Sequence, residues 1–318
     1  MAEAILESAS KTKKSRLTLG ERLRRNPVTL KELRSRMRGR RAFVMITIHV
    51  LLLSGIVSLV YLAFSASNSI YSNPSTLQTL GKIIFSVVVG LQLLMLCFIA
   101  PALTVGAISA ERERQTFDLL RATLLSARAL VLGKLLSALS FTGLLMLAAI
   151  PLQSLAFLFG GITLEEVFIG TLMLVVTAIA FSALGLFFSS FTKRTLISTA
   201  LANGTAILLV IGLPIVLFVT LSIMSPVIYG YGGTTDPATQ ARLLAIQWLI
   251  ISITPLAAGI ATQATLANGQ GALVLSMPFG GGNTLQLLSP WIGYTIVYLL
   301  LSVILIALSI RFVKRVEK

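Results

Sequence analysis

The sequence contains very little of the chemistry that a soluble enzyme uses. Its 318 residues include one cysteine, Cys97, and one histidine, His49. A single cysteine excludes a disulfide framework or a cysteine metal site within one chain, and a single histidine excludes zinc sites of the HExxH type. Charged residues make up only 12% of the chain. No carboxylate–histidine constellation accompanies the many serines and threonines, so an enzyme is disfavoured.

Apolar residues fill the space that these absences leave. They make up 56% of the chain, and the mean hydropathy is +0.92. A soluble core does not need that composition, which is typical of an integral membrane protein. The net charge of +15 could indicate nucleic-acid binding, but half of the 26 basic residues lie at or before Arg41 and most others flank apolar runs. That distribution is typical of membrane-topology signals, and we expect no nucleic-acid partner.

Six apolar runs are long enough to cross a bilayer. We therefore expect an all-α integral membrane protein, with a basic cytoplasmic segment at 1–41 and a six-span domain at 42–318. The predicted spans are 42–64, 83–110, 129–159, 167–191, 196–224 and 291–310. A polar loop that includes Lys82 precedes the second span, Ser126 can cap the third, Gly160-Gly161 turns the chain after it, and Pro226 is typical of a loop after the fifth.

The basic N-terminal segment has an amphipathic pattern. Asn26-Pro27 is typical of a helix start, and Leu30, Leu33 and Met37 then share one helical face. We expect a helix lying on the inner membrane surface, where each basic side chain gains about 1 kcal/mol from anionic lipid. A solvated positive flank explains the charge equally well. The anchoring residues would be Arg34, Arg36, Arg38, Arg40 and Arg41.

The segment at 225–290 is ambiguous, because glycines and prolines interrupt it. Its apolar part, 243–261, could cross the membrane or remain on one side. If it does not cross, all basic residues except Lys82 and Arg242 lie in the cytoplasm with both termini. We therefore predict a re-entrant or surface helix on the outer side, between spans five and six.

The stretch 111–134 interrupts the apolar sequence between spans two and three. It mixes acidic and basic residues, and its leucines form an apolar side. A short charged helix held between two spans is suited to docking in a partner's groove. An ordinary charged cytoplasmic loop would have a similar charge content.

The order of residues in this stretch resembles the coupling region of ABC transporter permeases of the export type (ABC type 2 membrane subunits). That family has a Glu-rich start, Gly-Thr, an acidic residue, Leu-Leu, Thr-Pro-Leu-Ser and a later Gly-Lys. This chain departs at Gln115, where glycine is usual, and at Leu124, where proline is usual. The residues NPVTLKELRSRMRGRR also resemble the family's N-terminal segment. The matching residues are Glu111, Glu113, Thr116, Asp118, Leu119, Leu120, Thr123, Leu125, Ser126, Gly133 and Lys134.

The resemblance implies a coupling helix that receives force from a separate ATP-binding subunit. It also implies a second permease copy or paralogue, a location in the inner or plasma membrane, and export. ATP and Mg²⁺ would be bound by the partner subunit, and this chain would bind no cofactor. The expected coupling residues are Glu111, Glu113, Thr116, Asp118, Leu119, Leu120, Arg121 and Ser126.

The sequence has no Walker A motif, since neither Gly81-Lys82 nor Gly133-Lys134 has the required flanking residues. Two alternatives to an exporter subunit remain: a secondary transporter, or a membrane anchor of an ABC-like complex that does not transport. Secondary transport usually uses carboxylates near the bilayer midplane, and the predicted spans have none away from their ends. Among Asp, Glu, Lys, Arg and His, His49 is the only residue within a predicted span and away from its ends, where a helix–helix hydrogen bond is more usual than a proton relay. Gln92, Gln153 and Gln247 could line a path or simply bond a neighbour.

Overall fold

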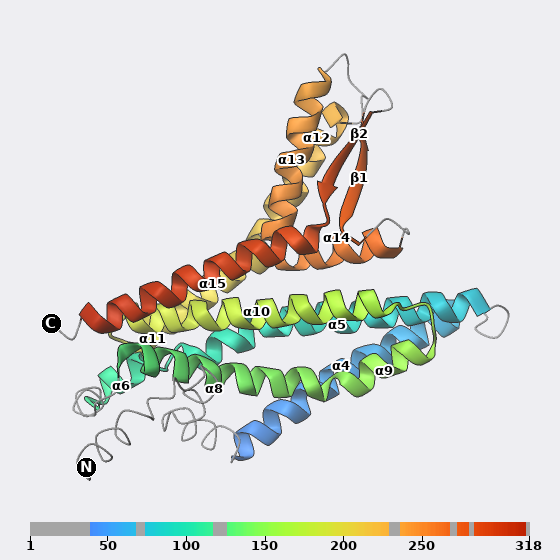
Figure 1. Ribbon diagram of the computed structural model, residues 1–318. Coiled ribbons are helices and arrows are strands. Elements are labelled where there is room, and N and C mark those ends of the chain that lie inside the picture. Colours follow the sequence, from blue (N-terminus) through green and yellow to red (C-terminus); the bar gives the residue numbers. More distant parts are fainter. Residues whose placement is uncertain are drawn as a thin grey trace, which may run out of the picture.

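The computed structural model describes residues 39–67, 74–116, 126–228, 236–267, 272–279 and 283–315. Within these ranges the chain forms a helical bundle with one short β-hairpin (Figure 1). Six helical stretches are long and apolar enough to cross a membrane, which confirms the predicted all-α membrane fold. They are Ala42–Ala66, Ser75–Glu113, Ala127–Leu158, Leu164–Phe191, Thr195–Met224 and Pro290–Arg315.

Several spans consist of more than one helix. A proline accompanies the interruptions, since it cannot donate an intrahelical hydrogen bond: Pro101 precedes the end of α5, Pro151 follows the break after α8, and Pro214 follows the π segment η1. The elements of the spans are α4 (Arg40–Ser67); α5 (Pro74–Thr104) and α6 (Ser109–Glu113); α8 (Ala127–Ala148) and α9 (Ile150–Leu158); α10 (Leu164–Phe191); α11 (Thr195–Ile207), η1 (Leu208–Gly212) and α12 (Leu213–Ile228); and α15 (Pro290–Arg315).

Two spans begin earlier than the sequence predicts. Helix α5 begins at Pro74, so Lys82, which was assigned to a polar loop, lies within a helix. Proline is favourable at the first helical position, where no intrahelical N–H bond is lost. Helix α10 begins at Leu164, and a capping box joins Thr163 to Glu166. The two residues exchange side chain-to-backbone hydrogen bonds of 3.0 and 3.2 Å, which start the helix before its apolar run.

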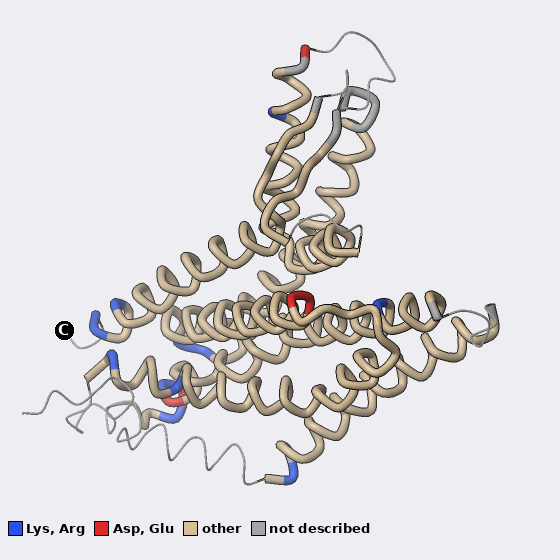
Figure 2. The backbone as a smooth tube through the Cα atoms, turned by 45° about the vertical axis from the view of Figure 1, so that its right-hand side comes forward, with Lys and Arg blue, Asp and Glu red and all other residues tan. Residues whose placement is uncertain are grey.

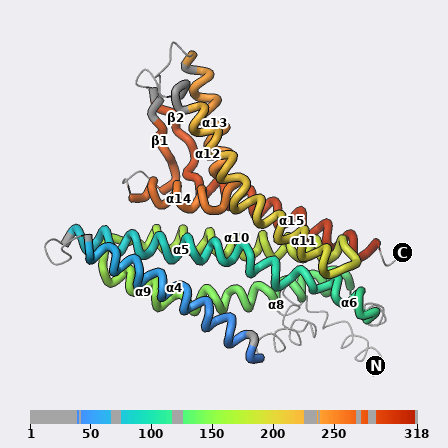
Figure 3. The backbone as a smooth tube through the Cα atoms, turned by 180° about the vertical axis from the view of Figure 1, so that it is seen from behind, coloured from blue at the N-terminus to red at the C-terminus, as the bar shows by residue number. Residues whose placement is uncertain are grey.

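Helices α5 and α10 form the centre of the bundle. Helices α4, α8 and α9 lie on one side of this pair, and α11 and α15 lie on the other (Figures 1 and 3). Gly185 allows a close approach, because a Cβ atom there would lie 2.6 Å from the Pro101 carbonyl oxygen. The Thr104 hydroxyl donates to the Ser182 carbonyl oxygen at 2.9 Å and joins the two helices. In a bilayer, small residues and interhelical hydrogen bonds of this kind hold spans together.

Helix α6, the start of α8, the start of α11 and the end of α15 lie together at one end of the bundle. Val313, near the end of α15, packs in one apolar cluster with Ile108, before α6, and Ala127, at the start of α8. Helix α11 also starts there, after a two-residue turn at Lys193 and Arg194. Many of the basic residues in the described part of the chain gather at this end (Figure 2). At the opposite end, Gly160 and Gly161 form the predicted turn with φ values of 81° and 79°.

Between α12 and α15 the chain forms a bent helix pair and a hairpin. Helices α13 (Pro237–Ile253) and α14 (Pro255–Ala267) meet at 113°. This is a broken span or a re-entrant loop by length and composition. Of the two residues that the sequence predicts to break this helix, Pro255 lies at the break and Gly259 lies within α14. The predicted loop around Pro226 is wrong, because α12 continues to Ile228.

The antiparallel hairpin of β1 (Val274–Phe279) and β2 (Asn283–Leu288) was not predicted. Gly280–Gly282 between two short apolar runs was the available signal, because three-residue hairpin connections favour glycine. Both tryptophans of the chain hold this region. Trp248 Nε1 donates to the Leu288 carbonyl oxygen at 2.6 Å, and Trp291 Nε1 donates to the Ala272 carbonyl oxygen at 2.7 Å.

This arrangement predicts which ends are accessible from one side of the membrane. The buried Cys97 can be replaced by alanine, and single cysteines placed at the exposed Thr116, Glu165 and Lys314. A membrane-impermeant maleimide applied to sealed vesicles should label Thr116→Cys and Lys314→Cys from one side and Glu165→Cys from the other. Labelling of Lys314→Cys and Glu165→Cys from the same side would show that the α13–α14 pair crosses the membrane.

Candidate functional site

The described part of the predicted coupling stretch centres on the short helix α6. It carries three consecutive charged residues, Glu111, Arg112 and Glu113, at the end of the second span. Four predicted coupling residues, Asp118, Leu119, Leu120 and Arg121, lie outside the described residues. The structure therefore shows how the beginning and end of the stretch are held, and α6 is the part with defined contacts.

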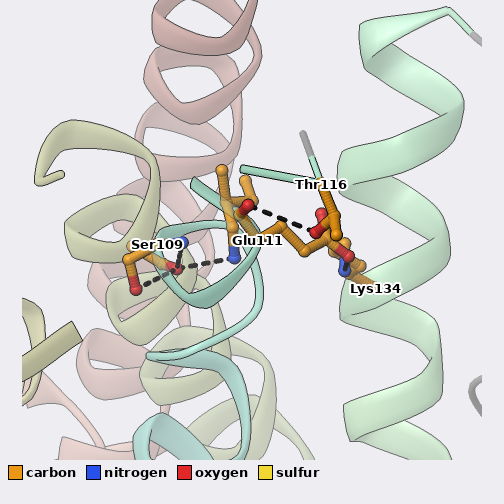
Figure 4. A network of polar contacts seen from close by, with 6 residues as sticks. Ser109, Glu111, Thr116 and Lys134 are labelled. Atoms are coloured by element: carbon orange, nitrogen blue, oxygen red, sulfur yellow. Dashed lines mark hydrogen bonds and ion pairs between the residues drawn. The ribbon is translucent and has the colours of Figure 1, made fainter. Parts of the chain in front are cut away.

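Glu111 joins α6 to α8. Its Oε1 atom accepts a hydrogen bond from Lys134 Nζ at 2.7 Å, and the two form an ion pair (Figure 4). The Lys134 side chain is only 3% exposed, whereas that of Glu111 is 25% exposed. An ammonium group removed from water needs an opposite charge, so this contact positions the two elements relative to one another. The structure thus brings together two residues from opposite ends of the predicted coupling stretch.

Arg112 joins α6 to the end of α10. Its Nη1 atom donates to the carbonyl oxygens of Ser190 and Thr192 at 2.9 and 3.2 Å. The last carbonyl groups of a helix lack intrahelical donors, and a cation is favoured beside them. Arg112 therefore caps the C-terminus of α10 from another segment of the chain.

Glu113 joins α6 to the start of α11. One carboxylate oxygen accepts the Thr195 N–H at 3.0 Å, and the other accepts the Thr195 hydroxyl. The N-cap residue of α11, Arg194, makes no side-chain capping bond. A carboxylate from α6 therefore supplies both the acceptor and the negative charge that a helix N-terminus favours.

The N-terminus of α6 is capped in the same way from α10. Ser189 Oγ accepts the N–H groups of Ile108 and Ser109 at 2.9 and 3.1 Å. Ser109 and Ser198 both donate to the Val105 carbonyl oxygen at 3.0 Å, which fastens the turn before α6 to α11. These buried hydroxyl groups satisfy backbone groups that the interruption of the second span leaves without helical partners.

Helix α6 ends in a tight left-handed turn at Gln115, where φ is 56°. Thr116 N–H donates to the Glu111 carbonyl oxygen at 3.0 Å, and Gln115 N–H donates to that of Arg112 at 3.1 Å. This pair of bonds is a Schellman motif, in which glycine is common at the left-handed position. The glycine that is usual in the resembled family would stand at this position, and glutamine adopts the same turn here.

The remaining predicted site residues have different outcomes. Ser126 is exposed and caps α8, its Oγ accepting the Ala129 N–H at 3.3 Å, as the sequence predicted. Arg40 and Arg41 lie in the first turn of α4, immediately before the expected span start at 42. Arg34, Arg36 and Arg38, with the predicted surface helix, lie outside the described residues.

His49 lies in α4 and is 1% exposed. Neither ring nitrogen has a hydrogen-bond partner among the described residues. The helix–helix hydrogen bond that its position favoured is therefore not formed within this part of the chain.

Sequence reasoning missed the residues that bind the charges of α6. Ser189, Ser190, Thr192 and Thr195 follow α6 by about 80 residues, and their common residue types carry no local signal. The assembled site contains side chains that fasten helix ends, and no nucleophile–base pair among them. Its geometry suits the transmission of a displacement of α6 to α8, α10 and α11 together.

The Glu111–Lys134 pair can be tested by a double-mutant cycle. Glu111→Gln and Lys134→Met should each lower the free energy of unfolding by about 2–3 kcal/mol, because each leaves a charge without this partner. The double variant should lose less stability than the sum of the two single variants. The apparent unfolding temperatures of the three variants in detergent measure these losses. Arg114→Gln, at an exposed neighbour, should change little. Additive losses in the double variant would contradict a direct stabilising contact.

The left-handed turn at Gln115 makes a second prediction. Gln115→Gly should raise stability by up to about 1 kcal/mol, because glycine adopts positive φ without the Cβ clash, whereas Gln115→Val should lower it. The matched control is Arg114→Gly, where φ is −82° and glycine should not stabilise. Thermal unfolding of the three variants in one detergent measures the effect. Stabilisation by Arg114→Gly but not by Gln115→Gly would contradict the prediction that the backbone is strained at Gln115.

Comparison with known proteins shows the family of this chain. A family model described as ABC-2 family transporter protein matches residues 27–315, which is most of the chain and includes every element described above. No curated protein matched the sequence. Because the match spans nearly the whole chain, the protein is a member of the ABC-2 transporter family, a multi-pass membrane protein of the ABC permease class.

Proposed function

We propose that this chain is the permease subunit of an ATP-driven exporter and works with a separate ATP-binding subunit. ATP and Mg²⁺ would be bound and ATP hydrolysed by that partner, since this sequence has no Walker A motif. Two permease chains, identical or paralogous, would form the complex in the cell membrane with both termini in the cytoplasm. The site predicted to receive the partner is the coupling region 111–134.

The arrangement of α6 is the observation that supports this proposal most directly. Three consecutive charged side chains each hold a different helix, since Glu111 binds α8, Arg112 caps α10 and Glu113 caps α11. A force applied to an ordinary surface loop would be lost in that loop. A force applied at α6 acts on the ends of several spans at once, because short polar contacts connect them.

The mechanism follows from this connection. Closure of two ATP-binding subunits would press on the coupling region and move spans two and three. Through Arg112 and Glu113 the displacement would also reach α10 and α11. The permease would then open outward by alternating access, and the segment 225–290 would act as a lid or exit guide. The free energy for this change would come from the partner's different affinity for the permease before and after it opens outward.

Exposed apolar surface is consistent with a second permease copy. In two spans, Ala42–Ala66 and Thr195–Met224, only 11% of the most apolar 18-residue stretch is buried within the protein, compared with 67% in Leu164–Phe191. Such surface faces lipid or another membrane subunit. A dimer would cover part of this apolar surface, and the rest would contact lipid.

The proposal is tested by co-purification of the tagged chain from its native membrane in mild detergent. We expect a protein with Walker motifs to accompany the wild-type chain and to be lost from an Asp118→Lys, Arg121→Glu variant, which reverses two charges in the coupling region. This variant keeps Glu113, whose replacement would also uncap α11. The readouts are the amount of ATPase recovered and its stimulation by the permease.

The matched control is Glu165→Lys, an exposed charge reversal at the opposite end of α10. It should retain the ATPase. Recovery of no ATPase from either wild-type or variant membranes would turn the interpretation toward a secondary transporter or a non-transporting anchor, and His49 would be the next residue to replace. An ATPase that binds and stimulates without transport of any cargo in vesicles would indicate the anchor.

A further inference from the structure

A large cavity lies between α8, α9 and α10, away from the α6 junction. Its volume is about 1140 Å³, slightly above the roughly 300–1,000 Å³ that small-molecule sites occupy. The lining is almost entirely apolar, and in the described part of the chain it contains no charged side chain. Three of its rim residues, Leu147, Leu158 and Leu164, are 61–80% exposed. They belong to spans, so the cavity opens sideways toward the bilayer.

Two features of the backbone create this space. Helices α8 and α9 break at Ala149, and Pro151 follows in the first turn of α9. Gly143 of α8 lines the cavity, and a Cβ atom built there would meet no atom within 4 Å. An added Cβ atom at Gly143 therefore enters open space on the cavity side of α8.

A buried amide on the inner wall distinguishes this cavity from bulk lipid, and the side chains of Ser140, Gln153, Ser154 and Thr171 also line it. Gln92 of α5 lines it and is fully buried, and its Oε1 accepts a hydrogen bond from Gln153 Nε2 at 3.2 Å. Gln92 Nε2 has no hydrogen-bond partner among the described residues. A buried donor without a partner is unfavourable, and a ligand that supplies an acceptor would satisfy it.

Apolar contact alone cannot select a ligand here, because lipid tails are as apolar as the cavity wall. Selectivity must come from the shape of the cavity and from its few polar groups. Among these, Gln92 Nε2 is a buried donor without a partner in the described part of the chain, whereas the Ser140 and Ser154 hydroxyls already donate to backbone carbonyl oxygens. An ionised headgroup would find no counter-charge in the lining, and its desolvation would be costly. The occupant is therefore uncharged and carries its acceptor within an apolar body.

We propose that this cavity is a binding site for one uncharged, largely apolar molecule that enters from the bilayer and whose carbonyl oxygen accepts a hydrogen bond from Gln92 Nε2. A neutral membrane lipid and an added hydrophobic compound share this chemistry. That the occupant is the transported cargo rests on the proposed function. Occupancy itself needs no ATPase, so failure of the binding experiment and failure of the coupling experiment are distinguishable.

The test uses the purified full chain in nanodiscs and two diazirine-bearing probes, a long-chain ketone and the matched alkane in which CH₂ replaces the carbonyl group. The ketone should label α8, α9 and α10 at the cavity more strongly than the alkane, by roughly 3- to 30-fold, the range for a hydrogen bond within a membrane. Cross-linked residues are identified by peptide mass spectrometry. Gln92→Leu should remove the preference for the ketone.

The variant Gly143→Phe, which places a ring inside the cavity, should lower the preferential ketone labelling of the residues that line it, while the outer faces of these helices remain open to both probes. Its matched control is Gly55→Phe in α4, where an added Cβ atom also meets no atom within 4 Å but which is not part of the cavity lining. It should label as the wild type does. Gly143→Leu repeats the test with a smaller side chain, and size-exclusion profiles show that each variant is folded.

Two further observations identify the source of the occupant. A neutral lipid that co-purifies with the wild type, competes with the ketone and is lost in Gly143→Phe would identify a membrane lipid. Competition by an added hydrophobic carbonyl compound without any retained lipid would identify an external ligand. Equal labelling by ketone and alkane in the wild type, unchanged labelling in Gly143→Phe, or cross-linking of the cavity to a co-purified protein in place of the probe would overturn the proposal.

Discussion

The structure depends on one constraint, that polar groups at the interruption of a membrane span must find partners within the protein. The second span is interrupted after Pro101. Backbone N–H and C=O groups between α5 and α6 that lacked hydrogen-bond partners would destabilise the protein in a bilayer. Ser189, from a helix about 80 residues later in the sequence, accepts the two N–H groups at the start of α6. The local break in one helix therefore requires the close packing of α6 against α10.

The same constraint explains why the charges of α6 bind polar groups of other helices in the same chain. Glu111, Arg112 and Glu113 bind an ammonium group, carbonyl oxygens and an amide of three other helices. Each contact matches a charge to the opposite partial or full charge at a helix end or a buried side chain. The residues expected to meet a partner subunit thus also form the internal connection to the spans. In a permease driven by a partner, recognition and transmission would use neighbouring residues of one short segment.

The spans themselves divide into a tightly packed centre and a looser periphery. Gly185 and Thr104 bring α5 and α10 together, and Thr177 and Tyr294 share a hydrogen bond of 2.7 Å between α10 and α15. Away from this centre, the break between α8 and α9 leaves the lateral cavity with Gln92 at its inner wall. Rigid packing near α6 and open volume toward the lipid are compatible with a protein in which force enters at one end and an apolar molecule is held at the side.

The sequence by itself determined the membrane class, the six spans, the Gly160-Gly161 turn and the Ser126 cap, because hydrophobic length and local capping chemistry are encoded in neighbouring residues. It also singled out Glu111 and Lys134 through a family pattern. Only the tertiary structure decided that Glu113 caps α11 and that the Gln92 amide nitrogen has no partner among the described residues. Those features depend on contacts between residues 40 to 80 or more positions apart or on an empty volume, and neither leaves a periodic signal along the chain.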